Sequence, residues 1–164
     1  MCSSAKSRRF VEDVVRSSLA SGDPGRALTA TLAAYAAEVY GFLRVVMPRG
    51  QDARRIYGRT IEVLQEELVA FPWDTELRVL VYTVARQQAR RARAGRSAIS
   101  TAHGYPLLPE DLELLVLRLD RELSWRQIAY TSLGSGTAED RLLAEADRLH
   151  ARFVAVRREV GGER

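Results

Sequence analysis

Cysteine, histidine and lysine are almost absent from this chain of 164 residues. Cys2 is the only cysteine, which excludes a disulfide within the chain and is typical of a protein from a reducing compartment. The two histidines and Cys2 lie too far apart in sequence for metal-ligand spacing. No carboxylate pair, Ser-His-Asp set or phosphate-binding loop stands out either. We therefore expect no metal, no cofactor and no enzymatic activity.

Long apolar runs are also missing. No stretch approaches the roughly 20 apolar residues of a membrane span. The N-terminus, MCSSAKSRRF, is basic, but the apolar core of a signal peptide does not follow it. We expect a cytoplasmic protein that has no membrane partner.

The charge of the chain is mildly basic. Lys and Arg number 25 against 21 Asp and Glu, which gives a net charge of +4. This balance weakly favours a nucleic-acid partner. Lys6 is the only lysine, but a preference for arginine can also reflect a GC-rich genome.

Apolar residues recur at three- and four-residue spacing along most of the chain, which predicts an all-α protein without strands. We expect a helical domain over 1–93, a linker over 94–107 and a second helical domain over 108–164. The helices are expected over 8–20, 25–47, 53–70, 74–93 and 110–120, with a short helix after Ser124 and a last one from about Thr137. The 110–120 helix is marked by Leu112, Leu115, Val116 and Leu119.

Several helix starts carry capping signals. Asp23 precedes Pro24, which suits an N-cap followed by the first helical residue. Ser124 and Gln127 have the spacing of a capping box. Asp52 is expected to cap the third helix, and either Asp74 or Thr75 the fourth.

The fourth expected helix, DTELRVLVYTVARQQARRAR, is rich in arginine. Cations near a helix C-terminus interact favourably with the helix dipole. The density of arginine exceeds what that effect requires, so we predict a polyanionic partner. A charged, solvated surface helix is the alternative interpretation.

The same helix resembles the promoter-reading helix of extracytoplasmic-function (ECF) sigma factors, small two-domain members of the bacterial sigma-70 family. The resemblance rests on Leu77-Arg78, Tyr82 and Val84-Ala85-Arg86, followed by the basic run. Further along the chain, four short segments resemble the start of the second sigma domain: Leu108-Pro109-Glu110, Leu117-Arg118-Leu119, Leu123-Ser124-Trp125 and Ile128-Ala129.

This resemblance implies a fold, a function and partners. The fold would be an N-terminal helical bundle (sigma region 2-like) with a C-terminal helix-turn-helix domain (sigma region 4-like). The function would be to direct RNA polymerase core to promoter DNA, with an anti-sigma or other regulatory protein as a further partner. The implied DNA-binding residues of the first domain are Arg78, Tyr82, Arg86, Arg90, Arg91 and Arg93. Those of the helix-turn-helix are Ser135, Thr137, Arg141 and Arg148, and the implied polymerase-binding residues are Asp52, Arg55, Ile56 and Arg59.

Two departures from the family pattern suggest an alternative function. The third helix carries Arg54, Arg55 and Arg59 where the family has acids, and Gly58 weakens this helix by about 1 kcal/mol relative to alanine. The last helix begins with acids at 139 and 140, which repel phosphate. The alternative is a sigma-derived interaction or regulatory module that no longer supports promoter-specific initiation.

The linker predicts how the two domains sit in the free protein. As a flexible coil, the 14 residues of 94–107 would hold their ends about 20 Å apart. We therefore expect a compact resting form that only a partner opens.

Overall fold

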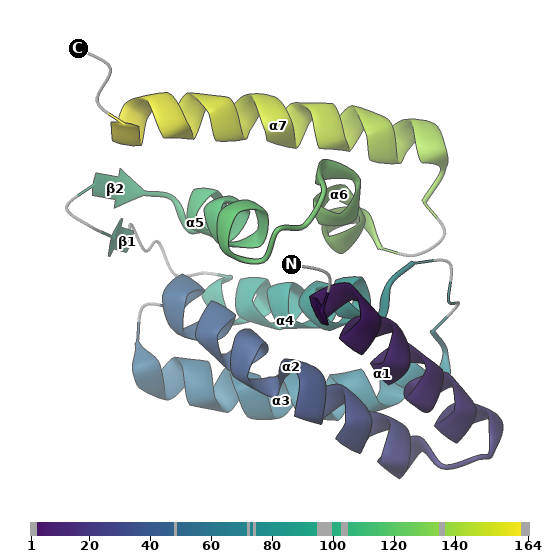
Figure 1. Ribbon diagram of the computed structural model, residues 1–164. Helices are drawn as coiled ribbons and strands as arrows, with labels where there is room; N and C mark the ends of the chain where they lie inside the picture. Colours follow the sequence, from purple (N-terminus) through teal and green to yellow (C-terminus); the bar gives the residue numbers. More distant parts are fainter. Residues whose placement is uncertain are drawn as a thin grey trace.

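The computed structural model describes residues 3–47, 49–71, 73, 75–94, 100–102, 105–134 and 137–161. Over these residues the protein is almost entirely helical, which confirms the expected fold class (Figure 1). The elements, in chain order, are α1 (Ser3–Ala20), α2 (Pro24–Val46), α3 (Gly50–Val69), α4 (Leu77–Arg93), β1 (Ser100–Ala102), β2 (Tyr105–Leu107), α5 (Pro109–Leu115), the π-helical turn η1 (Val116–Asp120), α6 (Trp125–Leu133) and α7 (Glu139–Gly161). No helix in this described part combines the length and apolarity needed to cross a membrane.

The helices are stacked in layers. α1 to α4 pack on one another, α5 and α6 lie against this bundle, and α7 covers α5 and α6 (Figure 1). One hydrophobic core runs through all the layers, from Tyr35 and Phe42 in α2 to Ile128 in α6 and Phe153 in α7. The two halves of the chain are thus packed together, as the length of the linker predicted.

Two of the predicted caps are confirmed. The Asp23 side chain accepts a hydrogen bond from the backbone N–H of Arg26 at 2.9 Å, and Pro24 is the first residue of α2. Ser124 and Gln127 form the complete capping box at the start of α6. Both signals are local in sequence, so neither depends on the tertiary fold.

The other two predicted caps are wrong. α3 begins at Gly50 with Arg49 as its N-cap, which leaves Asp52 inside the first turn. The N-cap of α4 is Glu76 rather than Thr75, and Asp74 lies outside the described residues. A distant side chain supplies the missing acceptor for α4: Glu12 of α1 accepts from the backbone N–H of Leu77 at 2.8 Å. Because this acceptor comes from 65 residues away, no local pattern predicts it.

The 110–120 segment ends in the π-helical turn η1 rather than as a regular α-helix. The N–H of Arg121 donates to the carbonyl of Val116 at 3.0 Å, which is the five-residue spacing of a π-helix. Leu117 is fully buried, three residues after the buried Leu114, while Leu119 is 59% exposed.

A short hairpin lies within the segment expected to be a linker. β1 and β2 pair antiparallel, with Ser100 opposite Leu107, and the Leu107 side chain is buried. The expectation of no strands fails for these six residues, because three-residue strands are too short to show an alternating pattern.

Candidate nucleic-acid interface

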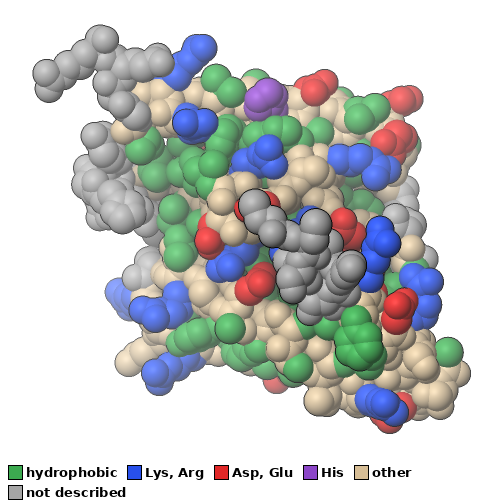
Figure 2. All heavy atoms as spheres, in the orientation of Figure 1, with side chains coloured by type: hydrophobic (Ala, Val, Ile, Leu, Met, Phe, Trp, Pro, Cys, Tyr) green, Lys and Arg blue, Asp and Glu red, His purple; other side chains and the backbone are tan. Residues whose placement is uncertain are grey.

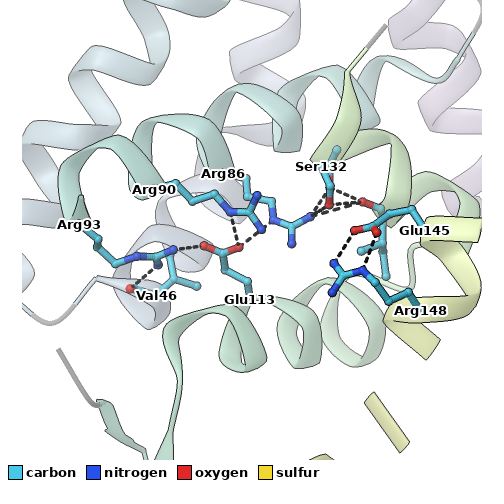
Figure 3. A network of polar contacts seen from close by, with 10 residues as sticks. Val46, Arg86, Arg90, Arg93, Glu113, Ser132, Glu145 and Arg148 are labelled. Atoms are coloured by element: carbon cyan, nitrogen blue, oxygen red, sulfur yellow. Dashed lines mark hydrogen bonds and ion pairs between the residues drawn. The ribbon is translucent and has the colours of Figure 1, made fainter. Parts of the chain in front are cut away.

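Three arginines of α4 form a row along the side of the helix that faces α5 (Figure 3). The arginine row consists of Arg86, Arg90 and Arg93, whose spacing of four and three residues places them on one helix face. The two ends of the row are buried, since the Arg86 and Arg93 side chains are 2% and 7% exposed, whereas Arg90 between them is 39% exposed. A buried guanidinium requires a charge partner and acceptors for its five N–H groups.

Glu113 of α5 is the charge partner of the whole row. Its side chain is fully buried, and its Oε2 atom lies 2.7 Å from Nε of Arg86 and 3.3 Å from Nε of Arg90. Its other oxygen, Oε1, accepts from a terminal nitrogen of Arg93. One carboxylate thus joins three successive turns of α4 to α5 (Figure 3).

Neutral acceptors complete the network around the row. Nη1 of Arg86 donates to Thr131 Oγ1 at 2.9 Å and to Ser132 Oγ at 2.6 Å, both in α6. Nη1 of Arg93 donates to the carbonyl of Val46 at the end of α2, at 3.1 Å. The row therefore ties α4 to α2, α5 and α6 at once.

The network is electrostatically unbalanced. Among the described residues, a single carboxylate contacts the three guanidinium groups of the row. Two positive charges are therefore in excess. Burial lowers the pKa of the Arg86 guanidinium, and the adjacent Glu113 carboxylate opposes that shift. Glu145 of α7 acts on the row from further away, but its carboxylate is bonded to Arg148 at 2.6 Å. A second anion would stabilise this surplus of positive charge, which is only partly exposed to solvent.

The other residues predicted in the first domain lie in different environments. Arg78 forms an ion pair with Glu76 at 2.6 Å and is largely buried. Tyr82 lies in the core of the N-terminal bundle, where its hydroxyl donates to Glu38 at 3.1 Å and burial raises its pKa. In this conformation the Tyr82 ring does not face solvent, whereas Arg91 does.

The residues predicted for the helix-turn-helix are only in part brought together. Ser135 lies outside the described residues, and the Thr137 hydroxyl is bonded to the carbonyl of Gly134 at 3.1 Å. Arg148 is held by Glu145, while Arg141 is exposed at the start of α7. The acids expected in the first turn of α7 are present at 139 and 140.

The four residues predicted to bind polymerase lie near the start of α3, and they do not share one surface. Ile56 is buried in the core. Arg55 and Arg59 are exposed, and each is near one acid: Arg55 lies 3.6 Å from Asp52, and Arg59 lies 2.7 Å from Glu62.

Sequence reasoning missed Glu113, Thr131 and Ser132, which complete the network around the arginine row. The sequence does carry a signal for the burial of Glu113, because this acid lies between Leu112 and Leu114 and four residues before the buried Leu117. An acid on an apolar helix face requires a buried cation as partner. No comparable signal marks Thr131 or Ser132.

Comparison of the chain with protein-family models, with curated proteins and with solved structures found no match.

Proposed function

We propose that this protein is a divergent transcription initiation factor of the ECF sigma type, whose free form is closed by the pairing of the arginine row with Glu113. In this proposal the bundle of α1 to α4 acts as the region 2-like domain and α5 to α7 as the region 4-like domain. Their partners are RNA polymerase core and promoter DNA. The observation that carries the proposal is the arginine row, whose positive charge exceeds what Glu113 neutralises.

Carboxylate and phosphate groups are interchangeable partners for an arginine. The planar guanidinium binds either group through paired N–H donors with similar geometry. Glu113 therefore occupies the position that a backbone phosphate would take if the row faced DNA. The distance of 2.7 Å to Arg86 is that of a charge-assisted hydrogen bond, and Arg90 lies at a longer 3.3 Å.

Opening of the closed form would uncover the row for DNA. The halves of the chain are held by the packing of α4 on α6 and of α2 on α5 and by the ion pairs of Glu113, and a partner that separates them must supply compensating interactions. For stacking on an unpaired base, Trp73 is better placed than Tyr82. Trp73 is half-buried, with Phe71 at 4.9 Å between ring centroids and the Arg16 guanidinium 4.8 Å from its centroid as a contact that a base would replace, whereas Tyr82 is fully enclosed in the bundle.

The surface of α7 favours the second function, an interaction or regulatory module without promoter-specific initiation. Arg148 and Arg152 are paired with acids of the protein itself, Glu145 and Asp111. Glu139, at the start of α7, is bonded to Arg126 of α6 at 2.8 Å. Two of the five arginines of α7 are therefore already neutralised, which reduces the positive charge that this helix can offer to phosphate.

Association with RNA polymerase core separates the two functions. The full chain is immobilised, mixed with purified core enzyme, and the retained polymerase is tested for initiation on a promoter library. A sigma factor retains core enzyme and initiates at defined sites. Retention without initiation favours the regulatory module, and the absence of both contradicts the sigma proposal.

A further inference from the structure

A strongly basic surface covers the junction between α2 and α3. This surface, the basic turn, consists of Arg44, Arg49, Arg54, Arg55 and Arg59. Residues 44–59 contain these five arginines and a single acid, Asp52, so their net charge of +4 equals that of the entire chain. Figure 2 shows Lys and Arg side chains gathered at the end of the molecule where α2 ends and α3 begins. Charge elsewhere in the sequence sums to zero.

Most of the basic turn is free of strong internal partners. Arg44, Arg49 and Arg54 are exposed, and none of them forms an ion pair or side-chain hydrogen bond with the part of the chain that the structure describes. The pairs made by Arg55 and Arg59 are on the surface, where the arginine side chains are 66% and 62% exposed. Exposed pairs of this kind exchange readily for other anions. The arginine row, by contrast, is held by Glu113.

Gly58 supplies a second observation, which is independent of charge. It lies inside α3 between Arg55 and Arg59, on the exposed face of the helix. Outside its own stretch of α3, a Cβ at this position would meet no atom of the described residues within 4 Å, and the backbone is not in the left-handed region that favours glycine. The packing of the protein therefore gives no reason for glycine here. A helix glycine on an open face lets another molecule approach the backbone closely.

We propose that the basic turn is a binding site for the phosphate backbone of duplex DNA, used without reading sequence. Arginine binds phosphate through paired donors, and the bare backbone at Gly58 admits a bulky strand between the charged side chains. Single strands are bound chiefly by stacking on open aromatic rings. Here the nearby rings of Tyr40 and Tyr57 pack edge to face on each other at 5.5 Å, which favours the duplex.

This site is separate from the arginine row and goes beyond the function proposed above. The basic turn is exposed while Glu113 still holds the row, so DNA binding there requires neither opening of the protein nor RNA polymerase. Failure of the protein to associate with polymerase would leave this site untouched.

The test is a salt titration of binding to a labelled 30-base-pair duplex, with the full chain and no polymerase. The variant Arg44→Gln/Arg49→Gln/Arg54→Gln removes the three unpaired charges. If each of them contacts a phosphate, the slope of log K against log salt becomes less negative by about 2.7. The loss of affinity between 50 and 200 mM salt then shrinks by about 40-fold relative to wild type.

The matched control removes three exposed arginines elsewhere, as Arg9→Gln/Arg26→Gln/Arg158→Gln. It has the same net charge as the first variant, and its salt slope should remain that of wild type. Equal slopes for the two triple variants, or no change in either, would overturn the proposal. Tighter binding to a single strand than to the duplex, or binding only to phosphatidylserine vesicles, would also overturn it.

Gly58→Gln tests the close approach without changing charge. The added side chain should weaken duplex binding at least several-fold while leaving the salt slope unchanged. Because glutamine is a better helix former than glycine, the melting temperature should not fall. Wild-type affinity in this variant would show that no strand approaches α3 at this position, and would contradict the proposed site.

Discussion

Replacing Glu113 with glutamine should be among the most destabilising single substitutions in this protein. The change removes the one carboxylate in contact with the arginine row among the described residues, and leaves Arg86 and Arg93 buried without a counter-charge. The glutamine amide also presents N–H donors to guanidinium groups that are themselves only donors.

The size of the effect follows from burial. Removing one partner of a buried ion pair costs about 3–5 kcal/mol, because the other charge stays in a medium of low polarity. In a chain of this length, each 1 kcal/mol lost from the free energy of unfolding lowers the melting temperature by about 2–4 °C. We therefore expect the melting temperature to fall by at least about 6 °C.

Urea denaturation, monitored by circular dichroism, measures the decrease in the free energy of unfolding directly. The control is Glu62→Gln, which breaks an ion pair of similar length, 2.7 Å, between side chains that are each more than 60% exposed. Exposed pairs contribute about 0–1 kcal/mol, so this variant should unfold close to wild type. If Glu113→Gln also unfolds within about 1 kcal/mol of wild type, the buried network does not hold the two halves together.

Three further predictions concern single side chains. Gly58→Ala should raise the free energy of unfolding by about 1 kcal/mol, because the added methyl group meets no neighbour and alanine favours the helix; unchanged urea denaturation would contradict this. Burial raises the pKa of Tyr35 to about 12, so the stability that its neutral form contributes is complete below the unfolded pKa near 10 and is lost as the pH rises toward 12. Tyr35→Phe should therefore lose less stability than wild type between pH 10 and 12, and equal losses in thermal melts would refute this. The Arg148 guanidinium lowers the pKa of Glu145, so this pair stabilises the fold above the unfolded pKa near 4.3 and the contribution is lost as the pH falls through the folded pKa. Glu145→Gln should flatten the dependence of melting temperature on pH below about 4.5, and an unaltered dependence would count against the pair.

The sequence predicted those parts of the fold that depend on neighbours along the chain. The Asp23–Pro24 start of α2 and the Ser124–Gln127 capping box were both readable, since each involves residues no more than three positions apart. The cap of α4 could not be predicted from the sequence, because Glu12 reaches Leu77 from another helix.

The candidate site was predictable only in part. An arginine-rich helix was evident in the sequence, but nothing in the composition of α4 indicates that Arg86 is buried while Arg91 is exposed. That difference depends on Glu113, 27 residues beyond Arg86, and therefore on how α5 packs against α4. The π-helical turn that follows α5 was equally hidden, since it alters helix register without a proline or glycine to mark it.

The most direct test of the central claim is duplex binding by Glu113→Gln compared with wild type across a salt titration. The claim is that Glu113 occupies the arginine row in the free protein and that release of the row creates a phosphate-binding surface. If so, the uncompensated arginines of the variant should drive the two halves apart, and the opened protein should bind DNA more tightly, with a salt slope more negative by about 2.7 for the three released arginines. Circular dichroism at each salt concentration verifies that the variant is folded. A helical Glu113→Gln protein whose salt slope equals that of wild type would contradict the claim.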